Sequence, residues 1–177
     1  MNIKMREEIF KNIVFLDIDG VLQNNFTEND SFTYEKDSIA FLNQLYEEFQ
    51  IKLVLSSSWR HAFTFQYKQD LLKENGILAP LIDRTYIVTD NERVHTAITL
   101  DDLDKCYTFN SKDVMTRDCE VFEWIKMFHP EHYLVLDDFS FSIESLESHR
   151  IKRLCAFEKG GCVNLGDLPE ARKILYL

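Results

Sequence analysis

The chain has 177 residues, 45% of them hydrophobic and 28% charged, and this favours a single folded globular domain spanning residues 1–177 over a disordered chain. Its formal net charge of -10 would repel a phosphate backbone, so nucleic acid is disfavoured as a general partner, although a local groove is not excluded. No stretch resembles a signal peptide or a membrane span, so we expect a cytoplasmic protein without a membrane partner.

The first half of the chain alternates apolar runs with helical periodicity. Residues 12–17 form a continuous apolar stretch, typical of a strand in a parallel sheet that is covered on both faces. A polar loop then leads to a predicted helix over residues 34–49, followed by a second short strand over residues 51–55. The next helix is predicted from about residue 60 to residue 74, because Asn75 and Gly76 are suited to end it.

The second half is less regular at its start. The sequence YIVT predicts a strand near Tyr86, and residues 90–112 are polar without firm periodicity, which indicates an inserted loop or small hairpin. Residues 116–128 have a helical apolar side, and residues 133–138 form another apolar strand that runs into acids.

Three further elements complete the chain. The sequence FSIESLES is compatible with one short helix, residues 151–157 with a strand, and residues 168–175 with a last helix. Regular alternation of strands and helices predicts an α/β fold, a Rossmann-like three-layer sandwich with a mainly parallel central sheet.

Three of the predicted strands end in polar side chains. Ligands of parallel sheets lie beyond the carboxyl ends of the strands, so these groups should converge in one small volume. Clustered carboxylates need a cation or raised pKa values, and hard oxygen ligands suit Mg²⁺, which also binds phosphate. Two of the groups also have a structural alternative, a helix or turn cap for the first acids and a helix N-cap for the serines. The groups are Asp17 and Asp19, Ser56 and Ser57, and Asp137 and Asp138.

The order of the motifs DIDGV, SSSW and LDD along the chain resembles the haloacid dehalogenase (HAD) superfamily of aspartate-nucleophile phosphatases. The resemblance covers roughly residues 12–177. The motif SSSWR with the closing LDD is also similar to small HAD domains associated with RNA repair proteins. Other phosphate chemistries lack support, because the chain has neither a Walker loop nor a G-x-G-x-x-G motif.

The resemblance implies a role for each acid of the first motif. Asp17 would be the nucleophile that attacks phosphorus and forms an aspartyl-phosphate. Asp19 would protonate the leaving alcohol and then deprotonate the hydrolytic water. Residues i and i+2 of an extended strand point to the same side, so both carboxylates should reach one phosphate. An acid at the second position favours phosphoester hydrolysis over the other chemistries of the superfamily.

Two further positions of the family pattern bind the phosphate. Ser56 would donate its hydroxyl to a phosphate oxygen, assisted by the backbone N–H of Ser57. The basic residue of the pattern is expected near the start of the helix that precedes the last acidic motif. Arg117 fits this place best, with Lys112 as the alternative.

The resemblance also implies Mg²⁺ as the cofactor. Its ligands would be the Asp17 carboxylate and the main-chain carbonyl of Asp19, completed by the LDD motif, phosphate and water. Neighbouring strand residues face opposite ways, so one acid of that motif should bind directly. We favour Asp138 as the direct ligand and Asp137 as its support, and the reverse assignment stays open.

The spacing of the motifs leaves room for no full cap domain, either in residues 20–51 or in residues 60–116. An open site admits bulky phosphorylated substrates, so we expect a phosphoprotein, including phosphotyrosine, ahead of polynucleotide ends, with small phosphomonoesters as a further option. The alternative from another class is a non-catalytic phosphate-binding or interaction module that kept the fold.

Overall fold

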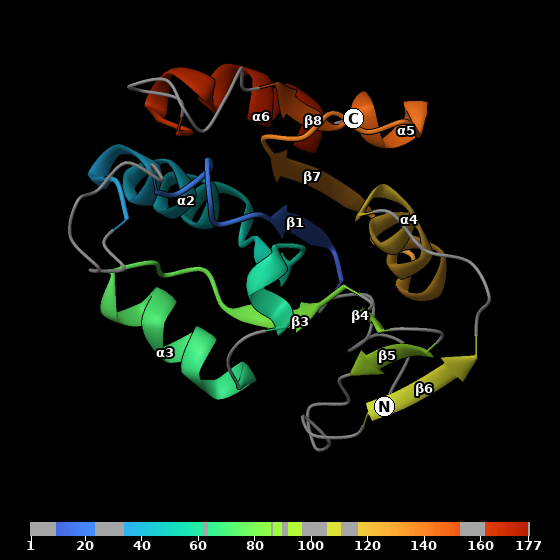
Figure 1. The fold of residues 1–177 in the computed structure, drawn as a ribbon. Helices are drawn as coiled ribbons and strands as arrows, with labels where there is room; N and C mark the ends of the chain where they lie inside the picture. The colour runs from blue at the N-terminus through green and yellow to red at the C-terminus, as the bar shows by residue number, and fades with distance from the viewer. Residues whose placement is uncertain are drawn as a thin grey trace.

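The computed structural model of the protein describes residues 10–23, 34–61, 64–85, 87–89, 92–96, 106–110, 117–152 and 162–176. Within these residues the architecture is α/β, with a parallel sheet between two layers of helices (Figure 1). The predicted Rossmann-like sandwich is therefore confirmed. That residues 1–177 form one domain stays a prediction.

The central sheet has five strands in the order β3-β2-β1-β7-β8, and every neighbouring pair is parallel. Parallel neighbours need crossover connections, which explains why helices separate most of these strands in the chain. The strands are β1 (Asn12–Leu16), β2 (Lys52–Leu55), β3 (Leu81–Arg84), β7 (His132–Asp137) and β8 (Arg150–Lys152).

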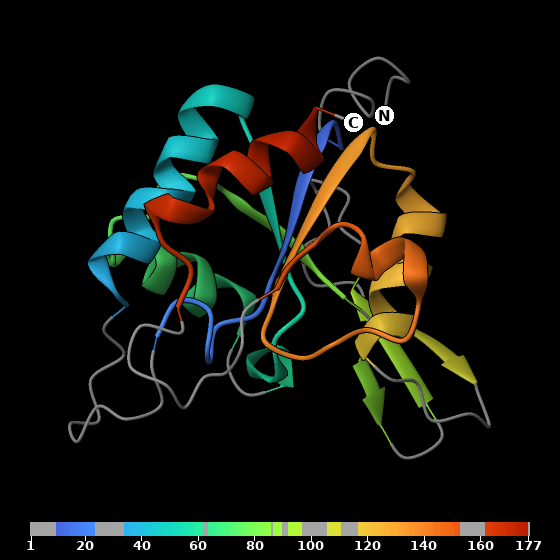
Figure 2. The same ribbon diagram turned by 90° about the horizontal axis from the view of Figure 1, so that it is seen from above.

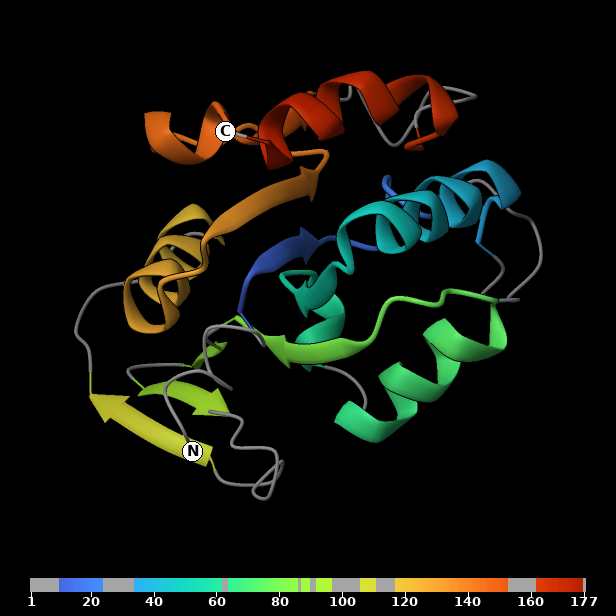
Figure 3. The same ribbon diagram turned by 180° about the vertical axis from the view of Figure 1, so that it is seen from behind.

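Helices cover both faces of this sheet. Figures 1 and 3 show α2, α3 and α6 on one face, and α4 and α5 on the other. Two short 3₁₀ segments, η1 (Ser58–His61) and η2 (Leu165–Asp167), lie between the main elements. The helices are α2 (Lys36–Phe49), α3 (Phe65–Glu74), α4 (Arg117–Phe128), α5 (Glu144–Glu147) and α6 (Leu168–Leu175).

The apolar core is divided into two halves by strand β1, because its side chains alternate between the faces of the sheet. Val14 and Leu16 belong to the cluster that includes residues of α2, α3 and α6. Ile13 and Phe15 belong to the cluster that includes residues of α4 and α5. All four are fully buried, so the opening apolar run of the sequence stabilises both layers of the core.

A second sheet is inserted between β3 and α4. It has three antiparallel strands in the order β4-β5-β6: β4 (Ile87–Thr89), β5 (Glu92–Thr96) and β6 (Cys106–Asn110). The strand predicted near Tyr86 is thus confirmed, and of the two alternatives for residues 90–112 the small hairpin is confirmed, because β5 and β6 pair antiparallel. The small sheet follows the C-terminal end of β3, and Figure 2 shows it beside α4.

The helix predicted from residue 60 begins later, at Phe65. The Oγ1 atom of Thr64 accepts a hydrogen bond from the backbone N–H of Tyr67 at 3.2 Å, which is an N-cap, and residues 58–61 form η1. The predicted end of this helix is confirmed, because Gly76 has a φ of 85° and follows the C-cap Asn75. Among the helices that the structure describes, none combines the length and apolar character needed to cross a bilayer.

Candidate active site

The register of the central sheet brings the polar strand ends together. Leu16 is paired with Leu136, and the N–H of Asp17 donates to the carbonyl of Leu136 at 2.9 Å. On the other side of β1, the N–H of Ser56 donates to the carbonyl of Leu16, also at 2.9 Å. Asp17 therefore lies between Ser56 and Asp137 in the row of residues that crosses the sheet at the ends of β2, β1 and β7. The first, second and last motifs meet in this row.

Three carboxylates form a compact acidic cluster at this edge. One oxygen from each of Asp17, Asp137 and Asp138 lies within 4.8 Å of the others. Arg117, the first residue of α4, lies beside the cluster: its Nη1 atom is 2.7 Å from Oδ2 of Asp17 and 3.0 Å from both carboxylate oxygens of Asp137. A single guanidinium nitrogen thus links the first and last acidic motifs.

The electrostatics of the cluster are those of crowded negative charge. Burial, together with the charge of Asp17, raises the pKa of Asp137 to about 7, although Arg117 opposes this rise. The pKa of Asp138 is also raised, by burial and by the charge of Asp17. Burial lowers the pKa of Arg117, but the carboxylates of Asp137 and Asp17 outweigh it and leave this pKa above its ordinary value.

The donor set fits a hard divalent cation. All three side chains offer carboxylate oxygens, the ligands that Mg²⁺ prefers. Among the described residues, the buried Oδ1 atom of Asp138 has no hydrogen-bond partner, whereas both oxygens of Asp137 accept from Arg117. A buried acceptor without a partner is costly, and a metal ion would satisfy it. Within the described residues, Asp138 thus offers this edge an unpartnered buried oxygen, and Asp137 does not.

Asp19 lies outside the three-carboxylate cluster. Its Oδ1 atom accepts a hydrogen bond from Nε2 of Gln23 at 2.8 Å, and its Oδ2 atom accepts one from Nε1 of Trp59, also at 2.8 Å. The strand ends at Leu16, and Gly20 turns the chain with a φ of 77°, so Asp19 belongs to this turn. The expectation of a continuous extended strand through both acids is therefore wrong, because the strand stops before Asp17.

Ser56 and Ser57 of the second motif are fully buried. Among the described residues, Oγ of Ser56 has no hydrogen-bond partner, so this hydroxyl is available to a bound group. Oγ of Ser57 accepts from the N–H of Trp59 at 3.3 Å. Nη1 of Arg60 donates to the carbonyls of Ser56 and Ser57, at 2.6 Å and 2.8 Å, and its Nη2 pairs with Glu120 of α4. A buried ion pair thus connects the serine loop to the helix that begins with Arg117.

Polar contacts also hold the loop that follows β7. The carboxylate of Asp118 accepts from the N–H of Ser142 at 3.0 Å and from its hydroxyl. Arg150 donates to the carbonyl of Asp137 at 3.2 Å and pairs with Glu147. Both ends of the loop are therefore attached to neighbouring elements, which restricts the position of the acidic cluster.

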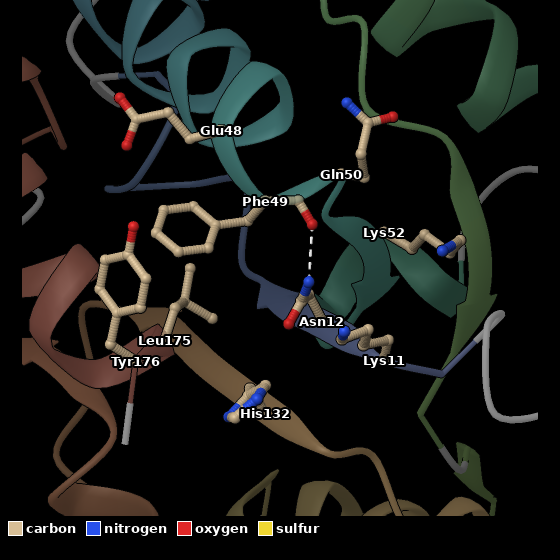
Figure 4. A pocket seen from close by; sticks show the side chains of 9 residues that line it. All are labelled: Lys11, Asn12, Glu48, Phe49, Gln50, Lys52, His132, Leu175 and Tyr176. Atoms are coloured by element: carbon tan, nitrogen blue, oxygen red, sulfur yellow. Dashed lines mark hydrogen bonds between the residues drawn. The ribbon is translucent and has the colours of Figure 1, made fainter.

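A cavity of about 610 Å³ lies at the opposite edge of the sheet (Figure 4). Lys11, Asn12, Lys52 and His132 line it, and three of these residues begin strands β1, β2 and β7. The acidic cluster is at the other ends of these strands. This cavity is consequently distinct from the candidate active site.

Fold and site together define a domain of the HAD superfamily. The model of the family described as "HAD domain in Swiss Army Knife RNA repair proteins" matches residues 13–160, and the chain belongs to this family. The resemblance stated from the motifs is thereby confirmed. No curated protein and no solved structure gives a significant match.

The structure brings further residues to the site, in roles that the motifs do not assign. Trp59 and Gln23 hold the carboxylate of Asp19, and Arg60 and Glu120 support the serine loop. Thr85, next to Ser56 along the sheet edge, is also buried, and its Oγ1 atom has no hydrogen-bond partner within the described part of the chain. Lys112, the alternative basic residue, lies outside the described residues.

Proposed function

We propose that the protein is a Mg²⁺-dependent phosphomonoester hydrolase that works through an aspartyl-phosphate on Asp17. One observation carries this proposal: the carboxylate of Asp17 lies within 4.8 Å of those of Asp137 and Asp138, while Arg117 binds both Asp17 and Asp137. Membership of the HAD family supports a phosphatase-like activity. A nucleophile, a cation site and a guanidinium are then present on one sheet edge.

In the proposed reaction, a carboxylate oxygen of Asp17 attacks phosphorus, and the bond from phosphorus to the leaving alcohol breaks. Asp19 supplies the proton that the alcohol takes away. Asp19, now a carboxylate, then removes a proton from water, and this water attacks phosphorus and releases phosphate and free Asp17. The hydrogen bonds from Gln23 and Trp59 hold the Asp19 carboxylate in one orientation for both steps.

The chain's own groups bind and orient the phosphate. Next to Asp17 at this sheet edge, the hydroxyl of Ser56 has no hydrogen-bond partner among the residues that the structure describes, and Arg117 neutralises charge beside the nucleophile. The carboxylates of Asp17 and Asp138, with the main-chain carbonyl of Asp19, would hold Mg²⁺, and Asp137 would support them through Arg117. When bound there, Mg²⁺ acts as a Lewis acid and offsets the charge of phosphate and carboxylates.

For the substrate, we infer a phosphorylated polynucleotide end. The description of the matching family places its domain in RNA repair proteins, which supports a nucleic-acid phosphate as the substrate. Nothing in this match supports the phosphoprotein that we expected first from the sequence alone. The net charge of -10 opposes broad nucleic-acid binding. A chain end, held mainly by its terminal phosphate, is compatible with that charge.

The proposal is tested by phosphate release from four substrates: 3′- and 5′-phosphorylated oligonucleotides, a tyrosine phosphopeptide and a sugar phosphate. Each is assayed with Mg²⁺, with a chelator, and with the variant Asp17→Asn. Glu170→Gln on α6, an exposed acid far from the cluster in sequence, is the matched control. We expect Mg²⁺-dependent release from an oligonucleotide by the wild type and the control, and none by Asp17→Asn.

Equal background release in all samples would refute the proposed hydrolase activity and favour the alternative, a non-catalytic phosphate-binding module. Release that persists in Asp17→Asn would refute the nucleophile. Hydrolysis of the phosphopeptide in preference to both oligonucleotides would refute the substrate class while retaining the chemistry.

A further inference from the structure

Phe139, the residue directly after the acidic motif, is an exposed aromatic side chain at the edge of the candidate site. Its exposed fraction is 65%, which leaves most of a large apolar ring in water. Exposure alone does not indicate a site, because single apolar side chains are common on protein surfaces. Its position relative to the reacting groups is the informative feature.

Two contacts connect this residue to the acidic cluster. Its backbone N–H donates to Oδ1 of Asp137 at 2.9 Å, which fixes where the chain leaves the cluster. The guanidinium carbon of Arg117 lies 5.3 Å from the centroid of its ring, within the range of a cation–π contact. Since the same guanidinium binds Asp17, only one side chain separates the ring from the proposed nucleophile.

An exposed ring beside a phosphate site suits a substrate with a flat group close to its phosphate. In a polynucleotide end, the terminal base is attached to the sugar that carries the phosphate. Bases stack on aromatic side chains irrespective of their sequence. We propose that Phe139 is a specificity-determining residue that stacks on the terminal base of a phosphorylated polynucleotide, an inference that rests on the proposed function.

A second role for the ring would be structural: Phe139 would only orient Arg117 through the cation–π contact. The two roles differ in their dependence on the substrate. Loss of an orienting ring slows every phosphomonoester by the same factor. Loss of a stacking ring slows substrates that carry a terminal base and spares those that lack it, so the ratio of the two rates separates the roles.

The test uses two oligonucleotides that differ only in the terminal nucleotide, which is either base-bearing or abasic, phosphorylated at the end that the wild type hydrolyses. The measured quantity is the preference, the ratio of kcat/KM for the base-bearing substrate to kcat/KM for the abasic one. It is measured for the wild type, Phe139→Ala, Phe139→Trp and the control Tyr176→Ala. Tyr176 is a more exposed aromatic, at 75%, and lines the cavity at the opposite sheet edge.

We expect Phe139→Ala to lower the preference about tenfold, chiefly through KM, as loss of one stacked base implies. Phe139→Trp should retain the preference, and Tyr176→Ala should match the wild type. An unchanged preference in Phe139→Ala, or an equal loss on both substrates, would overturn the stacking role while leaving the hydrolase intact. Absence of hydrolysis on every substrate would overturn the proposed function, and the role of Phe139 with it.

Discussion

Arg117 and Asp137 are joined through one nitrogen: Nη1 lies 3.0 Å from both carboxylate oxygens, and the same atom is 2.7 Å from Asp17. The residues come from the start of α4 and the ends of β7 and β1. A single positive group therefore compensates two acids that burial would otherwise make costly. This arrangement makes Arg117 the electrostatic link between Asp17, the proposed nucleophile, and Asp137, which lies beside the proposed metal ligand Asp138.

The contacts of Arg117 with Asp17 and Asp137 predict which substitutions this residue tolerates. Arginine and lysine differ most where both guanidinium nitrogens are used, yet only one nitrogen makes these contacts. Arg117→Met should lower kcat/KM about a hundredfold, the usual effect of losing a charge-stabilising donor. Arg117→Lys should stay within about tenfold of the wild type, since its ammonium can replace that donor. A lysine variant as inactive as the methionine variant would contradict this role for the single nitrogen.

Asp19 predicts a dependence on the leaving group. If it protonates the departing alcohol, Asp19→Asn should slow alkyl phosphates by roughly a hundredfold or more. Aryl phosphates with acidic phenols should be slowed far less in the first step, because such groups leave without a proton. Burst kinetics with both substrate types measure that step. Trp59→Phe keeps an aromatic ring at this position but removes the N–H donor to Asp19, and should give the same trend in weaker form. Equal losses on both substrate types would remove the acid role.

The pair Arg60–Glu120 predicts a stability effect. Both side chains are buried, with exposed fractions of 7% and 3%. Glu120→Gln would remove the carboxylate charge that pairs with the buried guanidinium of Arg60, which costs about 3 kcal/mol in free energy of unfolding. The surface pair Lys126–Glu123 on the same helix is the control, and Glu123→Gln should cost less than about 1 kcal/mol. Urea denaturation measures both, and equal costs would contradict a buried pair.

Asp83 predicts a pH dependence of stability. Its carboxylate in β3 is buried, accepts a hydrogen bond from Nε1 of Trp124 at 2.7 Å, and burial raises its pKa to about 7. In the unfolded chain the pKa is near the ordinary value of about 4. Between these values the folded state binds more protons, so the free energy of unfolding falls as pH rises, by up to about 4 kcal/mol.

The variant Asp83→Asn provides the comparison, because its amide stays neutral at every pH and retains one acceptor oxygen. Denaturation of both proteins at pH 5 and pH 8 isolates the contribution of this group. The wild type should lose more stability over this interval than Asp83→Asn. Parallel pH profiles of the two proteins would contradict the raised pKa.

Much of the site could be predicted from the sequence, because its main groups follow buried strands directly. Asp17, Ser56 and Asp137 come after apolar runs whose parallel pairing needs little more than hydrophobic burial. Arg117 was expected only from the resemblance to the HAD superfamily, whose basic residue comes near the start of the helix that precedes the last acidic motif. The convergence of Asp17, Ser56 and Asp137 depends on local pattern and on one rule of sheet topology, whereas the place of Arg117 depends on the family pattern.

The supporting contacts could not be predicted in this way. Trp59 reaches Asp19 across 40 residues of chain, and Arg60 reaches Glu120 across 60, so neither pair has a local signal. Strand β3 was missed because it is short and carries Asp83, a polar residue in a run that reads as a loop. Only its pairing with β2 and the hydrogen bond to Trp124 account for it. Tertiary context decides such positions.

The central claim is that Asp17 takes the phosphoryl group, and trapping this intermediate tests it most directly. The wild type, with Mg²⁺ and a phosphorylated oligonucleotide, is quenched with borohydride, which reduces an acyl phosphate on aspartate to homoserine. Mass spectrometry of the peptides then identifies the reduced residue. We predict homoserine at position 17, dependent on both substrate and Mg²⁺. An unmodified position 17 during measurable turnover, or homoserine at another aspartate, would contradict the account.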